Sequence, residues 1–157
     1  MRPHRLTNRV LDRRGDTTDA WQPAGRLLSI YVVATTPTGT RAALAAAQAH
    51  ARGLAARIVL LVPHVVPYAQ ALEHPADPTA FPADRYRGLA EELGIDVAIR
   101  ICLCRGRDAV ASLIPHDAVV LLGGRRRRWW PTREERAAGT LTKAGYRVLF
   151  VAARSAA

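Results

Sequence analysis

Short apolar runs alternate with alanine-rich or amphipathic stretches along most of the chain. The apolar runs are rich in valine, isoleucine and leucine and lie at residues 27–34, 57–62, 96–103, 117–122 and 147–152. Nearly continuous runs indicate strands buried on both faces, whereas 96–103 alternates in period two. The stretches between them follow a helical period at 38–52, 84–93, 107–114 and about 132–144. Residues 63–82 contain five prolines and predict a loop.

This order of elements predicts the α/β class, because strands that alternate with helices pair in parallel through right-handed crossovers. We expect one doubly wound domain with a five-stranded parallel sheet over residues 26–157. Residues 1–25 hold five arginines and three aspartates but no long apolar run, and they predict a flexible basic tail. Ligands of such folds bind beyond the carboxyl ends of the strands. We also expect Thr38 or Thr40 to cap the first helix.

The composition narrows the class of protein further. The 157 residues carry a formal net charge of +10, from 23 basic against 13 acidic residues, and 22 of the basic residues are arginines. Hydrophobic residues make up 49% of the chain, which excludes a disordered protein. No apolar run reaches the roughly 20 residues that span a bilayer. No sorting signal is recognisable, so we expect a cytoplasmic location.

Four passages resemble the universal stress protein family. They are RIVLLVPHVVP at 57–67, GLAEELGIDVAIRICLCRGR at 88–107, HDAVVLLGGRRRR at 116–128, and Gly139-Thr140 followed by YRVLFV at 146–151. The similarity runs from Leu27 to Ala153. It implies the adenine-nucleotide α-hydrolase-like fold of that family and a non-enzymatic regulatory or stress-response module. It also implies a homodimer formed through the last strand, Arg147 to Ala152.

The nucleotide-binding members of that family carry Gly-x-x-Gly, nine residues and then Gly-Ser/Thr, which hold phosphates with backbone amides and a hydroxyl. Gly124 matches the first position, and Arg127 replaces the second glycine. Eleven residues, instead of nine, separate Arg127 from Gly139. Two threonines stand where the family has an aspartate after its first strand. The resemblance therefore leaves two alternatives: the protein has no cofactor, or it binds ATP or AMP. Its implied ligand-binding residues are Thr35, Thr36, His64, Val65, Gly124, Arg127, Gly139 and Thr140.

The segment RRRRWW at 125–130 allows three interpretations. The side chains of Arg125–Arg128 can replace backbone amides around a phosphate, because a guanidinium is a planar, permanently charged donor. Together with Trp129 and Trp130 they can instead form a contact with a protein partner. A basic adaptor that binds nucleic acid is the third interpretation, since indoles stack on bases. One basic hexapeptide without an RNA-binding motif favours the protein contact over nucleic acid.

No catalytic or metal-ligating set is recognisable in the sequence. Cys102 and Cys104 form a C-x-C on a predicted strand without a third cysteine, so we expect buried thiols and no metal site. The chain has no Gly-x-x-x-x-Gly-Lys-Ser/Thr loop and no Ser-His-Asp spacing. We therefore expect a homodimeric module that is not an enzyme. An adenine-nucleotide-binding switch and a nucleic-acid adaptor are the alternatives.

Overall fold

The structure, a computed structural model, describes residues 9–11, 17–18, 28–65 and 83–154. Five parallel strands form the centre of its sheet in the order β5-β4-β3-β6-β7. They are β3 (Leu28–Val33), β4 (Ala56–Val65), β5 (Val97–Cys104), β6 (Val119–Gly124) and β7 (Arg147–Ala152). The predicted five-stranded parallel sheet is confirmed.

Two short strands extend this sheet beyond the five that were predicted. β1 (Arg9–Leu11) pairs antiparallel with β5, and β2 (Thr17–Thr18) pairs antiparallel with β1. Both belong to residues 1–25, for which the sequence predicts a flexible basic tail. The rest of that segment lies outside the described residues, as do residues 66–82 of the predicted proline-rich loop.

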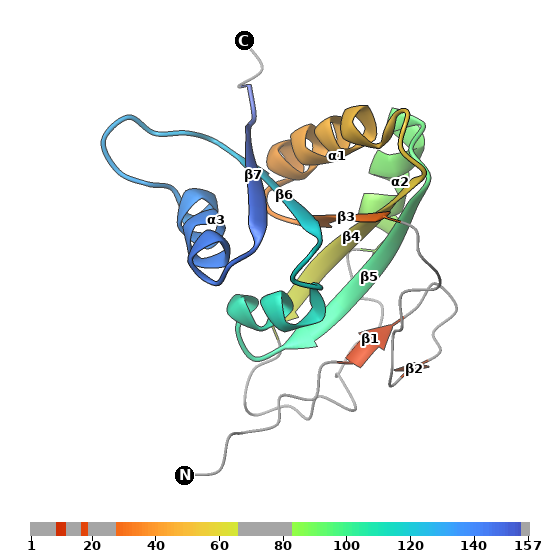
Figure 1. The fold of residues 1–157 in the computed structure, drawn as a ribbon, viewed down its shortest axis with the longest axis horizontal. Helices are drawn as coiled ribbons and strands as arrows, with labels where there is room; N and C mark the ends of the chain where they lie inside the picture. Colours follow the sequence, from red (N-terminus) through yellow and green to blue (C-terminus); the bar gives the residue numbers. More distant parts are fainter. Residues whose placement is uncertain (1–8, 12–16, 19–27, 66–82, 155–157) are drawn as a thin grey trace.

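The helices cover both faces of the sheet (Figure 1), as a doubly wound domain requires. Helices α1 (Pro37–Ala51) and α2 (Ala83–Leu93) pack on one face with Ile30 and Val32 of β3. The 3-10 helix η2 (Arg107–Leu113) and helix α3 (Arg133–Lys143) pack on the other face with Tyr31 and Val33. Alternate residues of β3 thus face two separate apolar clusters, which explains its nearly continuous apolar run.

The start of α1 differs from the prediction. Its N-cap is Thr36, whose hydroxyl accepts a hydrogen bond from the Gly39 amide at 3.1 Å, and neither Thr38 nor Thr40 caps the helix. Pro37 follows the cap, where its fixed φ suits the first helical turn and its missing N–H costs nothing. Three residues therefore separate the end of β3 from Pro37, where the helix begins, at the edge of the sheet where a ligand is expected.

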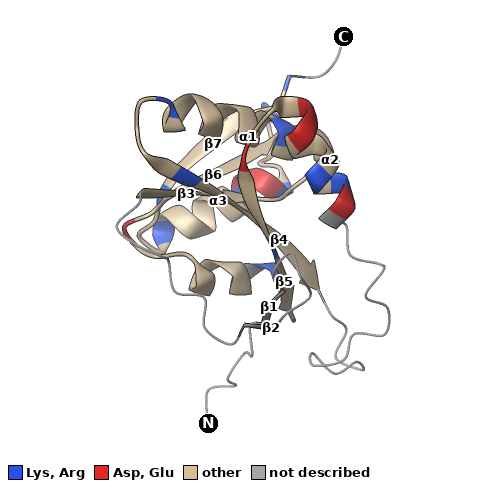
Figure 2. Ribbon diagram, turned by 90° about the vertical axis from the view of Figure 1, so that its right-hand side faces the viewer, with Lys and Arg blue, Asp and Glu red and all other residues tan. Residues whose placement is uncertain are grey.

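Charged residues on helix α2 largely compensate one another. The helix carries both basic and acidic residues (Figure 2), and Arg87 pairs with Asp84 at 2.6 Å. Glu92 of the same helix pairs with Arg41 of α1 at 2.8 Å. Both pairs are exposed, so each contributes little to stability. No helix in the described part of the chain is long and apolar enough to cross a membrane.

Candidate functional site

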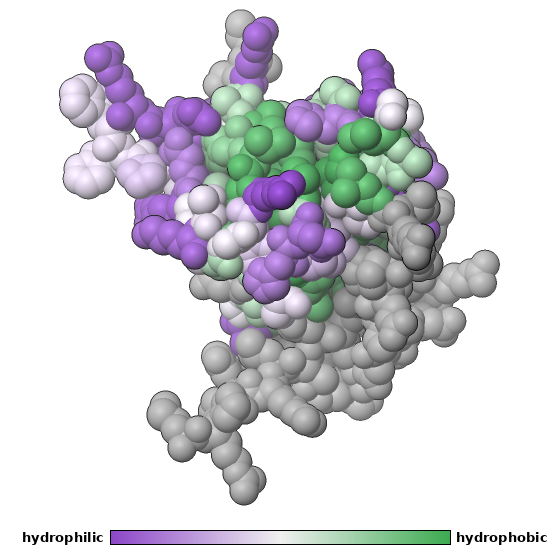
Figure 3. Space-filling model, viewed as in Figure 1, coloured by the Kyte–Doolittle hydropathy of each residue, from purple (hydrophilic) through white to green (hydrophobic). Residues whose placement is uncertain are grey.

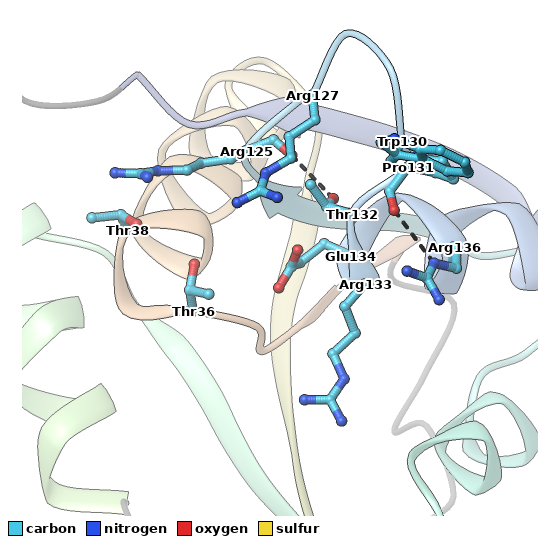
Figure 4. A pocket seen from close by; sticks show the side chains of 10 residues that line it. All are labelled: Thr36, Thr38, Arg125, Arg127, Trp130, Pro131, Thr132, Arg133, Glu134 and Arg136. Atoms are coloured by element: carbon cyan, nitrogen blue, oxygen red, sulfur yellow. Dashed lines mark hydrogen bonds between the residues drawn. The ribbon is translucent and has the colours of Figure 1, made fainter.

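A pocket opens where the direction of the chain through the sheet reverses. From β3 the chain moves through β4 to β5 and then returns to β6 on the other side of β3. The two loops that leave β3 and β6 therefore run to opposite faces, which leaves a crevice between them. The pocket there measures about 540 Å³. Its lining residues, labelled in Figure 4, are Thr36, Thr38, Arg125, Arg127, Trp130, Pro131, Thr132, Arg133, Glu134 and Arg136.

Behind the pocket, backbone atoms of α1 and β6 are in close contact. Helix α1 approaches β6 so closely that a Cβ atom added to Gly39 would lie 2.7 Å from the carbonyl carbon of Gly123. The Thr35 hydroxyl donates to the Gly123 carbonyl at 2.5 Å, and the Thr35 amide donates to the hydroxyl of the fully buried Thr40 at 2.9 Å. We call this arrangement the Gly39–Gly123 contact. It places the first turn of α1 directly beside the end of β6.

Residues Arg125–Pro131, which we call the arginine loop, form the outer wall. Along the loop, arginines that line the pocket alternate with arginines that lie over aromatic rings. Arg125 and Arg127 line the pocket, whereas the guanidinium carbon of Arg126 lies 5.4 Å from the ring centre of Phe150 and that of Arg128 lies 5.6 Å from Trp129. This alternation is that of an extended chain, in which successive side chains point to opposite sides. Of the four arginines in this loop, Arg125 and Arg127 thus face the space where a ligand could bind.

Hydrogen bonds hold the arginine loop at both ends. The Thr132 hydroxyl donates to the Arg125 carbonyl at 3.0 Å, and Nε of Arg136 donates to the Pro131 carbonyl at 3.3 Å (Figure 4). Thr132 is also the N-cap of α3 and shares a capping box with Glu135. The Glu135 amide donates to the Thr132 hydroxyl at 3.2 Å, and the Thr132 amide donates to Oε2 of Glu135 at 2.7 Å.

Two of the residues implied by the family resemblance line the pocket, namely Thr36 and Arg127. Thr35 lies behind them in the Gly39–Gly123 contact. Gly124 lies against the side chain of Glu134, because a Cβ added to it would be 2.7 Å from that of Glu134. The close approach that this glycine permits is therefore to helix α3.

The other implied residues lie outside the pocket lining. His64 and Val65 end β4, one strand away from β3 on the side opposite β6. Gly139 and Thr140 lie in the interior of α3, and the Thr140 hydroxyl donates to the Arg136 carbonyl at 3.0 Å. The interior amides of a helix already donate within the helix, so the Gly-Thr pair offers no free backbone donors to a phosphate there.

Sequence reasoning did not single out Thr38, Thr132, Arg133, Glu134 and Arg136 as pocket residues. One signal was available, because Thr-x-x-Glu at 132–135 is a capping box that marks the first turn of a helix. It places the start of α3, and with it three charged side chains of that helix, next to the end of β6. Thr38 lies in the first turn of α1, so its place in the pocket could be inferred only with the correct start of that helix.

The two cysteines lie apart from the pocket and are buried in β5. Burial raises the pKa of the Cys102 thiol to about 12, and burial also raises that of Cys104. The Cys104 thiol contacts the His64 carbonyl at 3.7 Å. Among the residues that the structure describes, no three histidine, cysteine or acidic side chains gather as metal ligands would.

The pocket has the chemistry of an anion site. Four arginines and one glutamate line it, and three threonine hydroxyls lie among them. Arginine keeps its charge at any physiological pH and presents donors in a planar fork that fits phosphate and carboxylate oxygens. The indole of Trp130 stands at the rim, where it is 78% exposed. Such a lining is chemically suited to an anionic group, and the indole offers a flat apolar surface beside it.

Comparison with known proteins adds no family to this description. The sequence matches no protein-family model, and no curated protein sequence matches it either.

Proposed function

We propose that the protein is a non-enzymatic, cytoplasmic regulatory module of the universal stress protein type that binds a phosphate-bearing small molecule in the pocket between β3 and β6. The observation that carries the proposal is the placement of four arginines around one pocket at the reversal point of a doubly wound sheet. ATP and AMP belong to the class of ligand that this lining fits. The arginine side chains take the part that glycine-loop amides play in the family's nucleotide sites.

Charge and shape both support a phosphate-bearing ligand. The pocket volume of about 540 Å³ lies in the range of small-molecule sites. In Figure 4 Arg125 and Arg127 point across the pocket toward Thr36 and Thr38, at the first turn of α1. The positive end of a helix adds to the attraction for an anion, and α1 has no acidic residue in its first turn. Trp130 can cover an aromatic or sugar ring that is attached to the phosphate.

Calorimetric titration with ATP, AMP and pyrophosphate tests the proposal. Arg127→Gln removes a pocket arginine, and we expect it to weaken ATP binding by about tenfold, as the loss of one charge-assisted contact does. Arg126→Gln is the matched control, because Arg126 belongs to the same loop but lies over Phe150. It should leave the affinity nearly unchanged. No heat of binding at millimolar ATP and pyrophosphate, or equal losses in both variants, would contradict a pocket site.

Native mass spectrometry of freshly purified protein addresses the same point without a chosen ligand. A co-purified phosphate ester that disappears in Arg127→Gln would identify the ligand directly. Bare wild-type protein that also fails to bind added nucleotides would favour a regulatory module that works through protein contacts alone.

We further propose that the module is a homodimer through β7, which forms the outer edge of the described sheet beside β6. An edge strand presents unpaired backbone groups that a second copy can satisfy. Leu149 in the middle of β7 is 41% exposed, so a dimer would also cover apolar surface.

The arginine loop is suited to a contact with another macromolecule. Trp129 is 81% exposed, which is unusual for a tryptophan outside an interface. Figure 3 shows pale and strongly hydrophilic side chains projecting from the body of the molecule at the place where this loop lies in Figure 1. Filter binding of a single-stranded oligonucleotide at low and moderate salt separates a nucleic acid from a protein partner. Affinity that falls steeply with salt would favour nucleic acid.

A further inference from the structure

Glu134 is a carboxylate in a pocket that is otherwise built for anions. It lines the pocket together with Arg125, Arg127, Arg133 and Arg136. Within the described residues it forms no ion pair with any of them, whereas Glu92 and Asp84 elsewhere are paired. In Figure 4 its carboxylate points into the space between Arg127 and Thr36. A ligand that fills this space meets both guanidinium donors and a carboxylate acceptor.

The position of this carboxylate depends on Gly124. A Cβ added to Gly124 would lie 2.7 Å from the Cβ of Glu134 and 2.8 Å from its Cγ, so the stem of the glutamate rests directly on the glycine backbone. Any other residue at position 124 would push that stem away from β6. The side chain is half-buried as a result, and its carboxylate is directed into the pocket.

A ligand that consists of phosphate alone fits this arrangement poorly. Its oxygens would accept hydrogen bonds from the arginines, but the carboxylate of Glu134 would repel them and would lose water without gaining a donor. A phosphate ester that carries free hydroxyl groups avoids this cost, because one hydroxyl can donate to the carboxylate. The carboxylate therefore distinguishes between two kinds of phosphate-bearing ligand.

We propose that Glu134, positioned by Gly124, makes the pocket selective for phosphate esters that carry free hydroxyl groups, such as sugar phosphates and nucleotides. Simple phosphates and phosphate esters of hydrocarbons bind less tightly. The phosphate lies on the arginines and a hydroxyl of the same molecule donates to the carboxylate. This inference rests on the proposed anion pocket. It adds a specificity residue that neither the glycine pattern nor the arginine run contains.

The test compares glycerol 3-phosphate with propyl phosphate, which share a three-carbon chain and a phosphate and differ in two hydroxyl groups. We expect the wild-type protein to bind glycerol phosphate about tenfold more tightly in calorimetric titrations, as one hydrogen bond to a charged group gives. In Glu134→Ala the ratio should fall to about one, because glycerol phosphate loses its acceptor and propyl phosphate no longer meets a like charge. A merely structural role of Glu134 would weaken both ligands by the same factor.

Two further variants keep the test decisive if Glu134→Ala folds poorly. Glu134→Gln has the same shape without the charge, so propyl phosphate should bind more tightly than to wild type. Gly124→Ala keeps the carboxylate but displaces it, so the ratio should fall while propyl phosphate still binds. Circular dichroism confirms that each variant is folded.

The outcomes separate the two proposals. Equal wild-type affinities for both esters would overturn the selectivity and leave the anion pocket standing. Binding of pyrophosphate without binding of either ester would likewise overturn the selectivity and leave the anion pocket standing. If the wild-type protein binds neither ester nor pyrophosphate, the anion pocket itself is wrong and the selectivity falls with it. A common loss factor in Glu134→Ala would assign the residue a structural role.

Discussion

The substitution Gly123→Ala tests whether the glycines at the end of β6 serve the packing of the sheet. The added methyl group would lie 2.6 Å from the carbonyl carbon of Gly39 and 3.0 Å from its Cα. Ordinary van der Waals contacts of such a carbon are 3.4–4 Å. All of these neighbours are backbone atoms of α1, so no side chain can turn away to make room.

The expected loss follows from what has to move. Helix α1 must shift away from β6 by about 1 Å, and its buried residues Thr40, Ala43, Leu44 and Ala47 shift with it. Overpacking in a core costs about 1–3 kcal/mol and occasionally more. Since backbone is involved on both sides, we expect a loss of about 3 kcal/mol in the free energy of unfolding. For a chain of this length that lowers Tm by roughly 6–12 °C.

Urea unfolding followed by circular dichroism measures this loss, and Gly139→Ala provides the matched control. An alanine Cβ at 139 meets no atom within 4 Å, and the residue lies inside α3. That substitution should stabilise the protein by about 0.5–1 kcal/mol, because alanine is a better helix former than glycine. If Gly123→Ala were within about 0.5 kcal/mol of wild type, the Gly39–Gly123 contact would not be as tight as described.

Three further predictions concern other parts of the structure. Thr132→Ala removes the capping box of α3 and the hydrogen bond to the Arg125 carbonyl, and should cost about 1 kcal/mol in urea unfolding; Thr132→Ser should restore most of it. Burial raises the pKa of Cys102 to about 12 from 9.0 and that of Tyr31 to about 12 from 10.0. The unfolded chain releases these protons first, so these two groups should lower the free energy of unfolding between about pH 9 and pH 12; a flat profile from about pH 9 to 12 would refute this expectation. Wild-type protein should have the mass of two chains in light scattering and Leu149→Lys that of one, whereas a wild-type mass of one chain at all micromolar concentrations would refute the β7 dimer.

The sequence was most informative about the parallel sheet. Strands such as β3 and β6 are buried on both faces, and only a nearly continuous apolar run satisfies both sides. The strands β1 and β2 could not be predicted, because three and two residues are too short to show a period. The pairing of β1 with β5, and of β2 with β1, depends on a free sheet edge, which is a property of the folded sheet.

The site was predicted in part. Thr36 and Arg127, which line the pocket, each lie three residues beyond the end of a strand, and strand ends are readable from the apolar pattern. Gly139 and Thr140 were implied by a glycine spacing that this chain does not keep, and the capping box at Thr132 starts the helix well before them. The role of Gly123 was hidden for a different reason. Its partner Gly39 is far away in the sequence, and nothing local signals that two backbones will touch.

The Gly39–Gly123 contact also determines which parts of the pocket can respond to a ligand. This contact lies behind the wall that Thr36 and Thr38 form, and a shift there would disturb the apolar cluster under α1. The opposite wall, the arginine loop, is exposed, and the hydrogen bonds described above hold it at its ends, while Arg126 lies over Phe150. If the proposed ligand binds, we expect any rearrangement to affect this loop and its two exposed indoles, Trp129 and Trp130, while the sheet stays as it is.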